Sequence, residues 1–201
     1  MVKDRYLAKI ARISVNHKIN IIFILGLITP LFPQSNLSFS LGSEYYVSQP
    51  GYDDASGISL DYRQRLNSNS EVGLKFNYSM MTYNIDGPSV TNSVNVSVYD
   101  VFLVYGYNPG YSFLTMDLKP LIGAGFKILN RAAMKVDLGA LGEETVASMS
   151  QTYFALLGGL LLVKKISGNL SFFIEPGIAF YDLKAFNRSF SIKGGINVQF
   201  N

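Results

Sequence analysis

The chain has 201 residues, of which 48% are apolar and 13% aromatic, and its mean hydropathy is +0.20. This length and composition fit one folded domain and exclude an intrinsically disordered chain. The sequence contains no cysteine, which excludes disulfides and thiolate metal sites.

The formal net charge of +3 comes from the N-terminal segment. Asp4 is the only acidic residue before position 36, and five of the 17 basic residues lie there: Lys3, Arg5, Lys9, Arg12 and Lys18. Without residues 1–35, 12 basic (17 − 5) and 13 acidic (14 − 1) residues remain, a net charge of −1. The body of the chain therefore lacks the basic excess typical of nucleic-acid-binding proteins, and we expect no nucleic-acid partner.

The N-terminal segment has the three parts of a secretory signal peptide. Residues 1–18 are polar and basic, and residues 19–32 form an apolar run of 14 residues that is followed by a proline and small residues. The run is short for a membrane helix, which needs about 20 residues. We predict a signal peptide over residues 1–35 and a mature domain over residues 36–201, with cleavage after Ser40 or an uncleaved anchor as alternatives.

Most of the body alternates apolar and polar residues. Side chains of a β-strand point to opposite faces in turn, so this alternation predicts strands with one apolar face. Residues 149–166 are apolar at both parities and are equally compatible with a helix. The eight expected strands are residues 37–47, 57–66, 71–83, 94–107, 112–130, 149–166, 170–182 and 188–201.

The connections between these strands alternate in length. The longer ones are centred near Pro50, Asp86, Leu141 and Phe186, with residues 131–148 the longest. The short turns lie near Asn67, Pro109 and Gly168. An even number of strands with short turns at one end and long loops at the other is typical of transmembrane β-barrels. In such a barrel both termini would be periplasmic and the longer loops would face outward.

The end of the chain carries a motif of its own. Lys193, Gly195, Val198 and Phe200 resemble the C-terminal assembly signal of bacterial outer-membrane barrels, which usually stops at the aromatic residue, whereas Asn201 follows here. Two further segments add to the resemblance: residues 99–107 (YDVFLVYGY) and residues 119–126 (KPLIGAGF).

These segments together resemble the small outer-membrane barrel family of the OmpA-transmembrane-domain and OmpX type. The resemblance implies an all-β fold: an eight-stranded antiparallel up-and-down transmembrane barrel, preceded by a signal-peptide helix, in the bacterial outer membrane. It further implies contact with outer-membrane lipid and lipopolysaccharide, and insertion by the barrel-assembly machinery. It brings no catalytic residues with it.

The charged residues of the strands fall on the polar parity. A Lys or Arg that faced lipid at the membrane midplane would cost about 2–4 kcal/mol, so we predict that these charges point into the lumen. An eight-stranded lumen holds little more than side chains. The simplest role of such a network is to fill and neutralise the lumen, and the alternative is a narrow gated pore. Its expected members are Glu44, Asp61, Arg63, Arg65, Lys75, Asp100, Lys127, Glu175 and Lys193.

The apolar parity is expected to face lipid. Aromatic residues near the strand ends would then form the girdles that membrane barrels place at the two water interfaces. The expected girdle residues are Tyr45, Tyr78, Tyr105, Tyr107, Phe180 and Phe200.

No motif for chemistry is present. His17, in the leader, is the only histidine, so the mature chain has none for a nucleophile–base pair. We expect no enzymatic activity, no cofactor and no metal site. The leading prediction is an outer-membrane protein with a structural or surface-interaction role through its outer loops, whose ligand the sequence does not identify. The alternatives are a narrow diffusion channel and a soluble lipocalin-like carrier, which would need its charged parity outside and its apolar parity inside.

Overall fold

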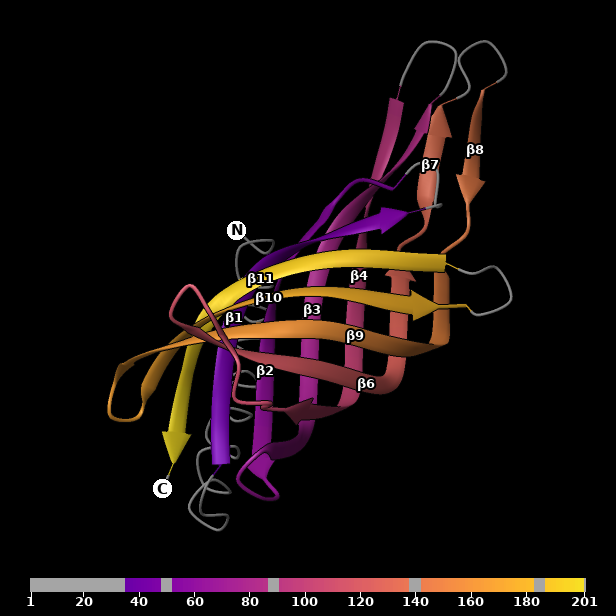
Figure 1. The fold of residues 1–201 in the computed structure, drawn as a ribbon. Coiled ribbons are helices and arrows are strands. Elements are labelled where there is room, and N and C mark those ends of the chain that lie inside the picture. Colours follow the sequence, from indigo (N-terminus) through magenta and orange to yellow (C-terminus); the bar gives the residue numbers. More distant parts are fainter. Residues whose placement is uncertain (1–34, 48–51, 87–90, 138–141, 183–186, 201) are drawn as a thin grey trace, which may run out of the picture.

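The structure is a computed structural model that describes residues 35–47, 52–86, 91–137, 142–182 and 187–200 (Figure 1). The predicted signal peptide lies outside these residues, apart from Ser35. Within the described ranges, no helix is long and apolar enough to cross a membrane.

Eight antiparallel strands close into a barrel, as predicted. Each strand pairs with the strand before and after it in the wall, the pairing of β4 with β6 included, and β1 pairs with β11 to complete the ring (Figure 1). The wall consists of β1 (Ser35–Val47), β2 (Ala55–Arg65), β3 (Ser70–Asp86), β4 (Thr91–Tyr107), β6 (Met116–Arg131), β9 (Met149–Ser167), β10 (Leu170–Tyr181) and β11 (Asn187–Phe200).

The register of the strands sets the width of the barrel. The stagger is found by starting at Leu37 on β1 and moving from each residue to its paired residue on the next strand. After all eight strands this path returns to β1 at Val47, so the stagger is ten residues (47 − 37). With a rise of about 3.3 Å per residue and strands about 4.8 Å apart, this stagger tilts the strands by about 40° and gives a radius of about 8 Å. A cylinder this narrow has room inside for side chains only.

Two segments expected as loops are partly strand, so these two predictions are wrong. β3 and β4 continue their pairing to Asp86 and Thr91, through most of the expected loop at residues 84–93. The expected longest loop, residues 131–148, contains a hairpin of β7 (Met134–Asp137) and β8 (Glu143–Val146). Strands of four residues are too short for alternation to reveal them. A further short strand, β5 (Ser112–Phe113), pairs with β6.

β9 is a strand rather than a helix, and its position explains why both of its faces are apolar. Its outward residues Phe154 and Leu156 are exposed on the wall, while its inward residues Leu157, Leu161 and Val163 are buried in the lumen. β9 therefore faces an apolar environment on both sides.

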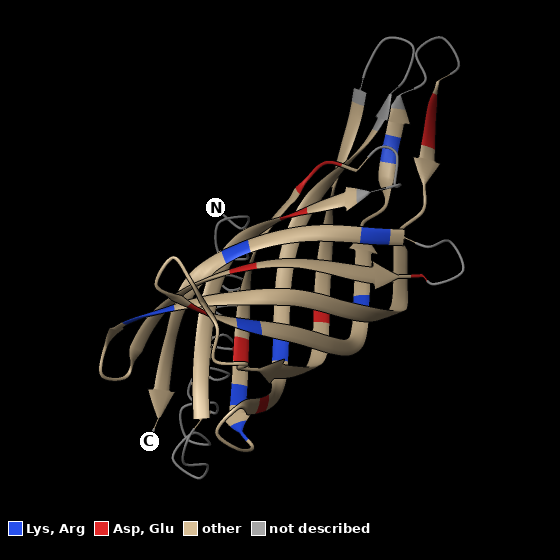
Figure 2. Ribbon diagram, in the orientation of Figure 1, with Lys and Arg blue, Asp and Glu red and all other residues tan. Residues whose placement is uncertain are grey.

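The remaining strands place apolar side chains outside and charged side chains inside. Leu103 and Ile122, on the outer wall, are 59% and 63% exposed, whereas Lys75 and Lys127, on the inner parity, are 1% and 0% exposed. Figure 2 shows the charged residues along the strands of the barrel. This sidedness is the reverse of what the lipocalin-like alternative requires.

Glycines on the inner parity allow close approach of neighbouring strands. A Cβ atom added to Gly195 would lie 2.0 Å from the carbonyl oxygen of Phe39 and 2.7 Å from the Cα of Ser40, on β1. A Cβ atom added to its neighbour Gly194, on the outer parity, would meet nothing closer than 3.9 Å. Gly195 therefore has a packing role in addition to its place in the C-terminal motif.

We expect Gly195→Ala to lower the free energy of unfolding by about 1–3 kcal/mol, because the added methyl group overpacks the β1–β11 seam. Gly194→Ala is the matched control and should change it little. Urea titration of protein refolded in detergent, without assembly machinery, measures both. Equal stability of the two variants would contradict the packing role of Gly195.

Candidate functional site

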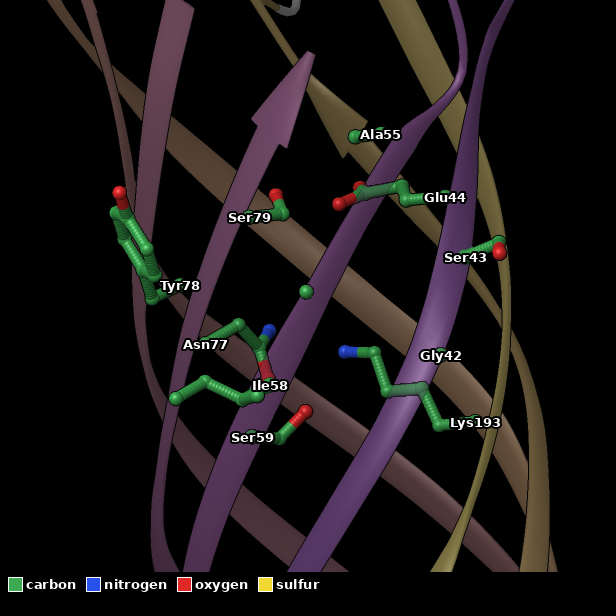
Figure 3. A pocket seen from close by; sticks show the side chains of 11 residues that line it. Gly42, Ser43, Glu44, Ala55, Ile58, Ser59, Asn77, Tyr78, Ser79 and Lys193 are labelled. Atoms are coloured by element: carbon green, nitrogen blue, oxygen red, sulfur yellow. The ribbon is translucent and has the colours of Figure 1, made fainter.

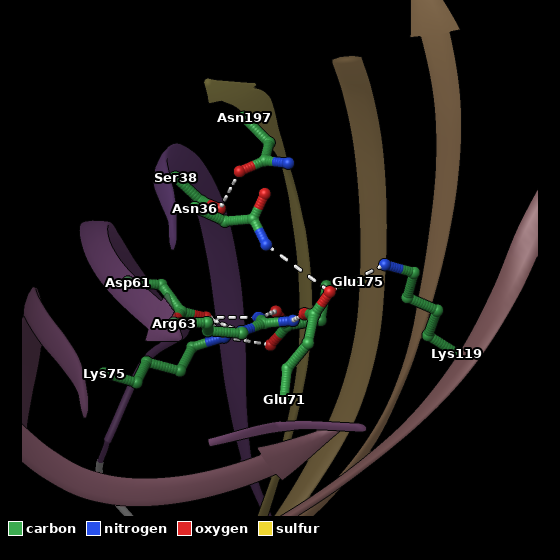
Figure 4. A network of polar contacts seen from close by, with 9 residues as sticks. All are labelled: Asn36, Ser38, Asp61, Arg63, Glu71, Lys75, Lys119, Glu175 and Asn197. Atoms are coloured by element: carbon green, nitrogen blue, oxygen red, sulfur yellow. Dashed lines mark hydrogen bonds and ion pairs between the residues drawn. The ribbon is translucent and has the colours of Figure 1, made fainter. Parts of the chain in front are cut away.

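The lumen is the candidate site, and its charged residues form two clusters. The lower cluster lies near the end of the barrel where Ser35 begins β1 and Phe200 ends β11. In this cluster Arg63 on β2 pairs with Asp61 on the same strand (Figure 4). The Arg63 guanidinium also lies 3.8 Å from Glu175 on β10. Lys75 on β3 pairs with Glu175 across the lumen, and its Nζ lies 3.9 Å from Asp61. Each of these four side chains is at most 4% exposed.

Glu71 on β3 extends the lower cluster towards β6. Its carboxylate accepts a hydrogen bond from the Lys119 ammonium at 3.0 Å and one from the Asn36 amide at 3.4 Å. It lies 4.0 Å from Arg63. Four wall strands, β1, β2, β3 and β6, therefore meet at Glu71.

The upper cluster is centred on Lys127 of β6. The Lys127 ammonium lies 2.9 Å from Glu44 on β1 and 3.1 Å from Asp100 on β4, and it is fully buried. Ser189 donates a hydrogen bond to Glu44, and the Asn77 amide donates one to Asp100 at 3.1 Å. Both carboxylates are therefore held by one ammonium and by neutral donors.

The other half of the lumen is apolar. The buried apolar side chains there come from β4, β6, β9 and β10, strands of which β4, β6 and β10 also contribute charged residues to the clusters. The members of this apolar half are Phe102, Val104, Leu121, Ala155, Leu157, Leu161, Val163, Phe173, Ala179 and Tyr181.

Tyrosines line the outer end of the lumen, above Lys127. The rings of Tyr46 and Tyr181 lie 6.1 Å apart, and the Lys127 ammonium lies 5.1 Å from the centroid of the Tyr46 ring. Further out, the rings of Tyr52 and Tyr83 lie 4.7 Å apart and the Arg131 guanidinium lies 5.0 Å over Tyr83. These aromatic contacts lie at the end of the lumen opposite Ser35 and Phe200.

Of the nine residues predicted for the network, seven lie in the two clusters. The other two, Arg65 and Lys193, have no ion pair within 4.0 Å to any described carboxylate. Sequence reasoning missed Glu71 and Lys119. Parity was the available signal, because Glu71 shares the face of Lys75 on β3 and Lys119 shares the face of Lys127 on β6.

The other residues of the C-terminal motif lie in the wall. Val198 and Phe200 are on the outer parity of β11, and Phe200 pairs with Ser35 at the start of β1. Within the described residues, no group of three or more His, Asp or Glu side chains is placed to hold a metal ion.

Aromatic side chains encircle the outer wall at one height, and this circle of side chains is called the aromatic ring below. By the strand rise and tilt given above, one outward aromatic side chain from each wall strand except β2 falls within about 5 Å of the same height along the barrel axis. Neighbouring rings touch, with centroids 5.1 Å apart for Tyr78 and Tyr99 and 6.2 Å apart for Phe126 and Phe154. The ring consists of Tyr45, Tyr78, Tyr99, Phe126, Phe154, Phe180 and Phe190.

The aromatic ring lies at the upper edge of an apolar belt. The outward cations Lys164 and Arg188 bound this belt and lie about 25 Å apart along the axis, by the same geometry. Between them the outward side chains are apolar or aromatic, apart from Ser43, Ser56 and, near the lower edge, Gln64. This height matches the apolar band of about 25 Å on transmembrane barrels.

No protein-family model matches the sequence, and no curated protein matches it. Among solved structures, Ail from Yersinia pestis is 18% identical over 84% of this chain and 99% of its own, with a TM-score of 0.50. Neisserial surface protein A is 15% identical over 83% and 97%, with a TM-score of 0.52. The outer-membrane protein OprG from Pseudomonas aeruginosa is 11% identical over 85% and 97%, with a TM-score of 0.53. The chain has the fold of the small outer-membrane β-barrels. At these identities the likeness concerns the fold of this barrel alone.

We expect Lys127→Met to lower the free energy of unfolding by about 3–5 kcal/mol, because it leaves Glu44 and Asp100 buried without their ion-pair partner. Lys135→Met is the control. Lys135 is 75% exposed and lies 3.3 Å from Glu143, an exposed pair worth at most about 1 kcal/mol. Urea titration in detergent micelles compares the two variants. Similar losses in both would show that the upper cluster does not stabilise the barrel.

Proposed function

We propose that this chain is an integral protein of the bacterial outer membrane, embedded in lipid and lipopolysaccharide, with a structural or surface-interaction role and no catalytic activity. The apolar belt of about 25 Å supports the membrane location, since it matches the apolar band of a transmembrane barrel. The likeness in fold to small outer-membrane barrels supports the bacterial outer membrane as the membrane in which this chain is embedded.

The part of the wall beyond the aromatic ring carries the proposed surface role. β3 and β4 remain paired from Tyr78–Tyr99 to Asp86–Thr91, which places the end of this extension about 20 Å above the ring. The β7–β8 hairpin lies next to β4 there (Figure 1). Among the residues of the extension whose side chains are described, the outward ones above the ring include hydroxyls and amides: Thr82, Asn84, Ser93, Asn95 and Ser97.

A surface role is consistent with two proteins of the same fold. Ail is named an attachment invasion locus protein, and the Neisserial protein is named a surface protein. The ligand class of the extension in this chain is left open by that comparison.

We further propose that the extension faces outward and that both ends of the barrel are periplasmic. Ser35 and Phe200 pair with each other at the end opposite the extension, where the β2–β3 and β9–β10 turns are short (Figure 1). In this orientation β11 is the strand that the barrel-assembly machinery would engage during insertion.

The absence of native cysteine allows a direct test of this orientation. Ser93→Cys, on the extension, should react with a membrane-impermeant maleimide in intact cells, whereas Ser68→Cys, in the β2–β3 turn, should react only after the outer membrane is permeabilised. Both variants should fractionate with the outer membrane and migrate differently on gels before and after heating. Labelling in the opposite order would overturn the orientation, and recovery in the soluble periplasm would overturn the membrane location.

The channel alternative makes a different prediction. The two charged clusters and the apolar half fill a cylinder about 8 Å in radius, so we expect no steady conductance when the protein is reconstituted in planar bilayers. Protein-free bilayers exposed to the same detergent are the control. Reproducible single-channel steps would favour the narrow diffusion channel.

A further inference from the structure

A small cavity lies between β1, β2, β3 and β11, and Glu44, Asn77 and Lys193 are among the residues that line it (Figure 3). Above it lie Glu44 and the upper cluster, and below it lies Lys75 with the lower cluster. About 10 Å³ of its volume is available to the centre of a water molecule. We propose that this cavity is a binding site for internal water, and that this water is the hydrogen-bond partner of Lys193.

Two glycines on the inner parity line the cavity, and at both of them the neighbouring strand lies too close to leave room for a side chain. A Cβ atom at Gly42 would lie 2.3 Å from the carbonyl oxygen of Ile192 and 2.6 Å from the Cγ of Lys193. A Cβ atom at Gly57 would lie 2.2 Å from the carbonyl oxygen of Tyr78. Neither position therefore accepts a larger residue without a shift of the backbone.

Polar groups without a protein partner line the cavity. The Oδ1 atom of Asn77 and the Oγ atom of Ser79 are buried, and neither has a hydrogen-bond partner among the described residues. The Lys193 side chain extends from β11 towards the same space, and no described carboxylate lies within 4.0 Å of its ammonium (Figure 3). A buried polar group left without a partner costs free energy, so the Oδ1 atom of Asn77 and the hydroxyl of Ser79 require one.

The charges of the lumen indicate that the partner is neutral. Three cations balance three carboxylates in the lower cluster, whereas the upper cluster has two carboxylates and one cation. The ammonium of Lys193 balances the excess negative charge of Glu44 and Asp100. An anion bound beside Lys193 would restore the imbalance.

Water satisfies all of these requirements. A buried water needs roughly 10–15 Å³ of such volume and two to four polar partners. Lys193 can only donate and the Oδ1 of Asn77 can only accept, so a water that accepts from Lys193 and donates to Asn77 fits both. The Ser79 hydroxyl can do either. Such a water would connect Lys193 to the upper cluster through Asn77, whose amide donates to Asp100.

The sign of a stability change tests the proposal. Removing a hydroxyl that has no partner stabilises a protein, whereas removing one that is bonded to a buried water destabilises it. We expect Ser79→Ala to lower the urea midpoint of unfolding. Tyr181→Phe is the control, because the Tyr181 hydroxyl is also without a protein partner but its ring lies in the apolar cluster, away from the cavity. This variant should leave the midpoint unchanged or raise it.

An unchanged or raised midpoint for Ser79→Ala would overturn the proposal. A crystal structure of the unmodified protein grown in sodium bromide gives a second test that does not depend on a variant folding. The expected result is a density peak without anomalous signal, within hydrogen-bond distance of Lys193 Nζ and Asn77 Oδ1. An anomalous bromide peak in the cavity, or a direct ion pair between Lys193 and Glu44, would overturn it.

Discussion

The stagger of ten residues around eight strands is the constraint on which the rest of this structure depends. It closes the wall at a radius of about 8 Å, so every second residue of each strand enters a space without room for bulk solvent. Charged residues on that parity must find partners within the lumen, and Lys127, Glu44 and Asp100 do so. The same narrow space brings inner glycines such as Gly195 against the neighbouring strand.

The inner and outer faces of the barrel wall carry different kinds of side chain. The inner face is occupied by side chains that bind one another. The outer face has an apolar belt, an aromatic ring and, above them, an extension of β3 and β4 that carries hydroxyl and amide side chains. The features available to a partner therefore lie at the end of the barrel beyond the ring.

Much of this fold could be predicted from the sequence, because alternation is a local property. The alternation of apolar and polar residues is enough to identify a strand and its two faces, as in Phe190, Ser191, Ile192 and Lys193. The β7–β8 hairpin was missed because four residues carry too little alternation. Ion-pair partners were not predictable, because they depend on the curvature of the closed wall. Glu175, for example, is opposite Lys193 in the register but binds Lys75 across the lumen.

The pairing of Lys75 with Glu175, which are 100 positions apart in the sequence, joins β3 to β10. Lys127 and Glu44 likewise join β6 to β1 across 83 residues. In a partly assembled sheet, the N-terminal strands would be present without the later strands that carry the partners of their charges. These charges would then face lipid unpaired. Entry into the bilayer and closure of the ring are therefore coupled, and intermediates with an open seam should be rare.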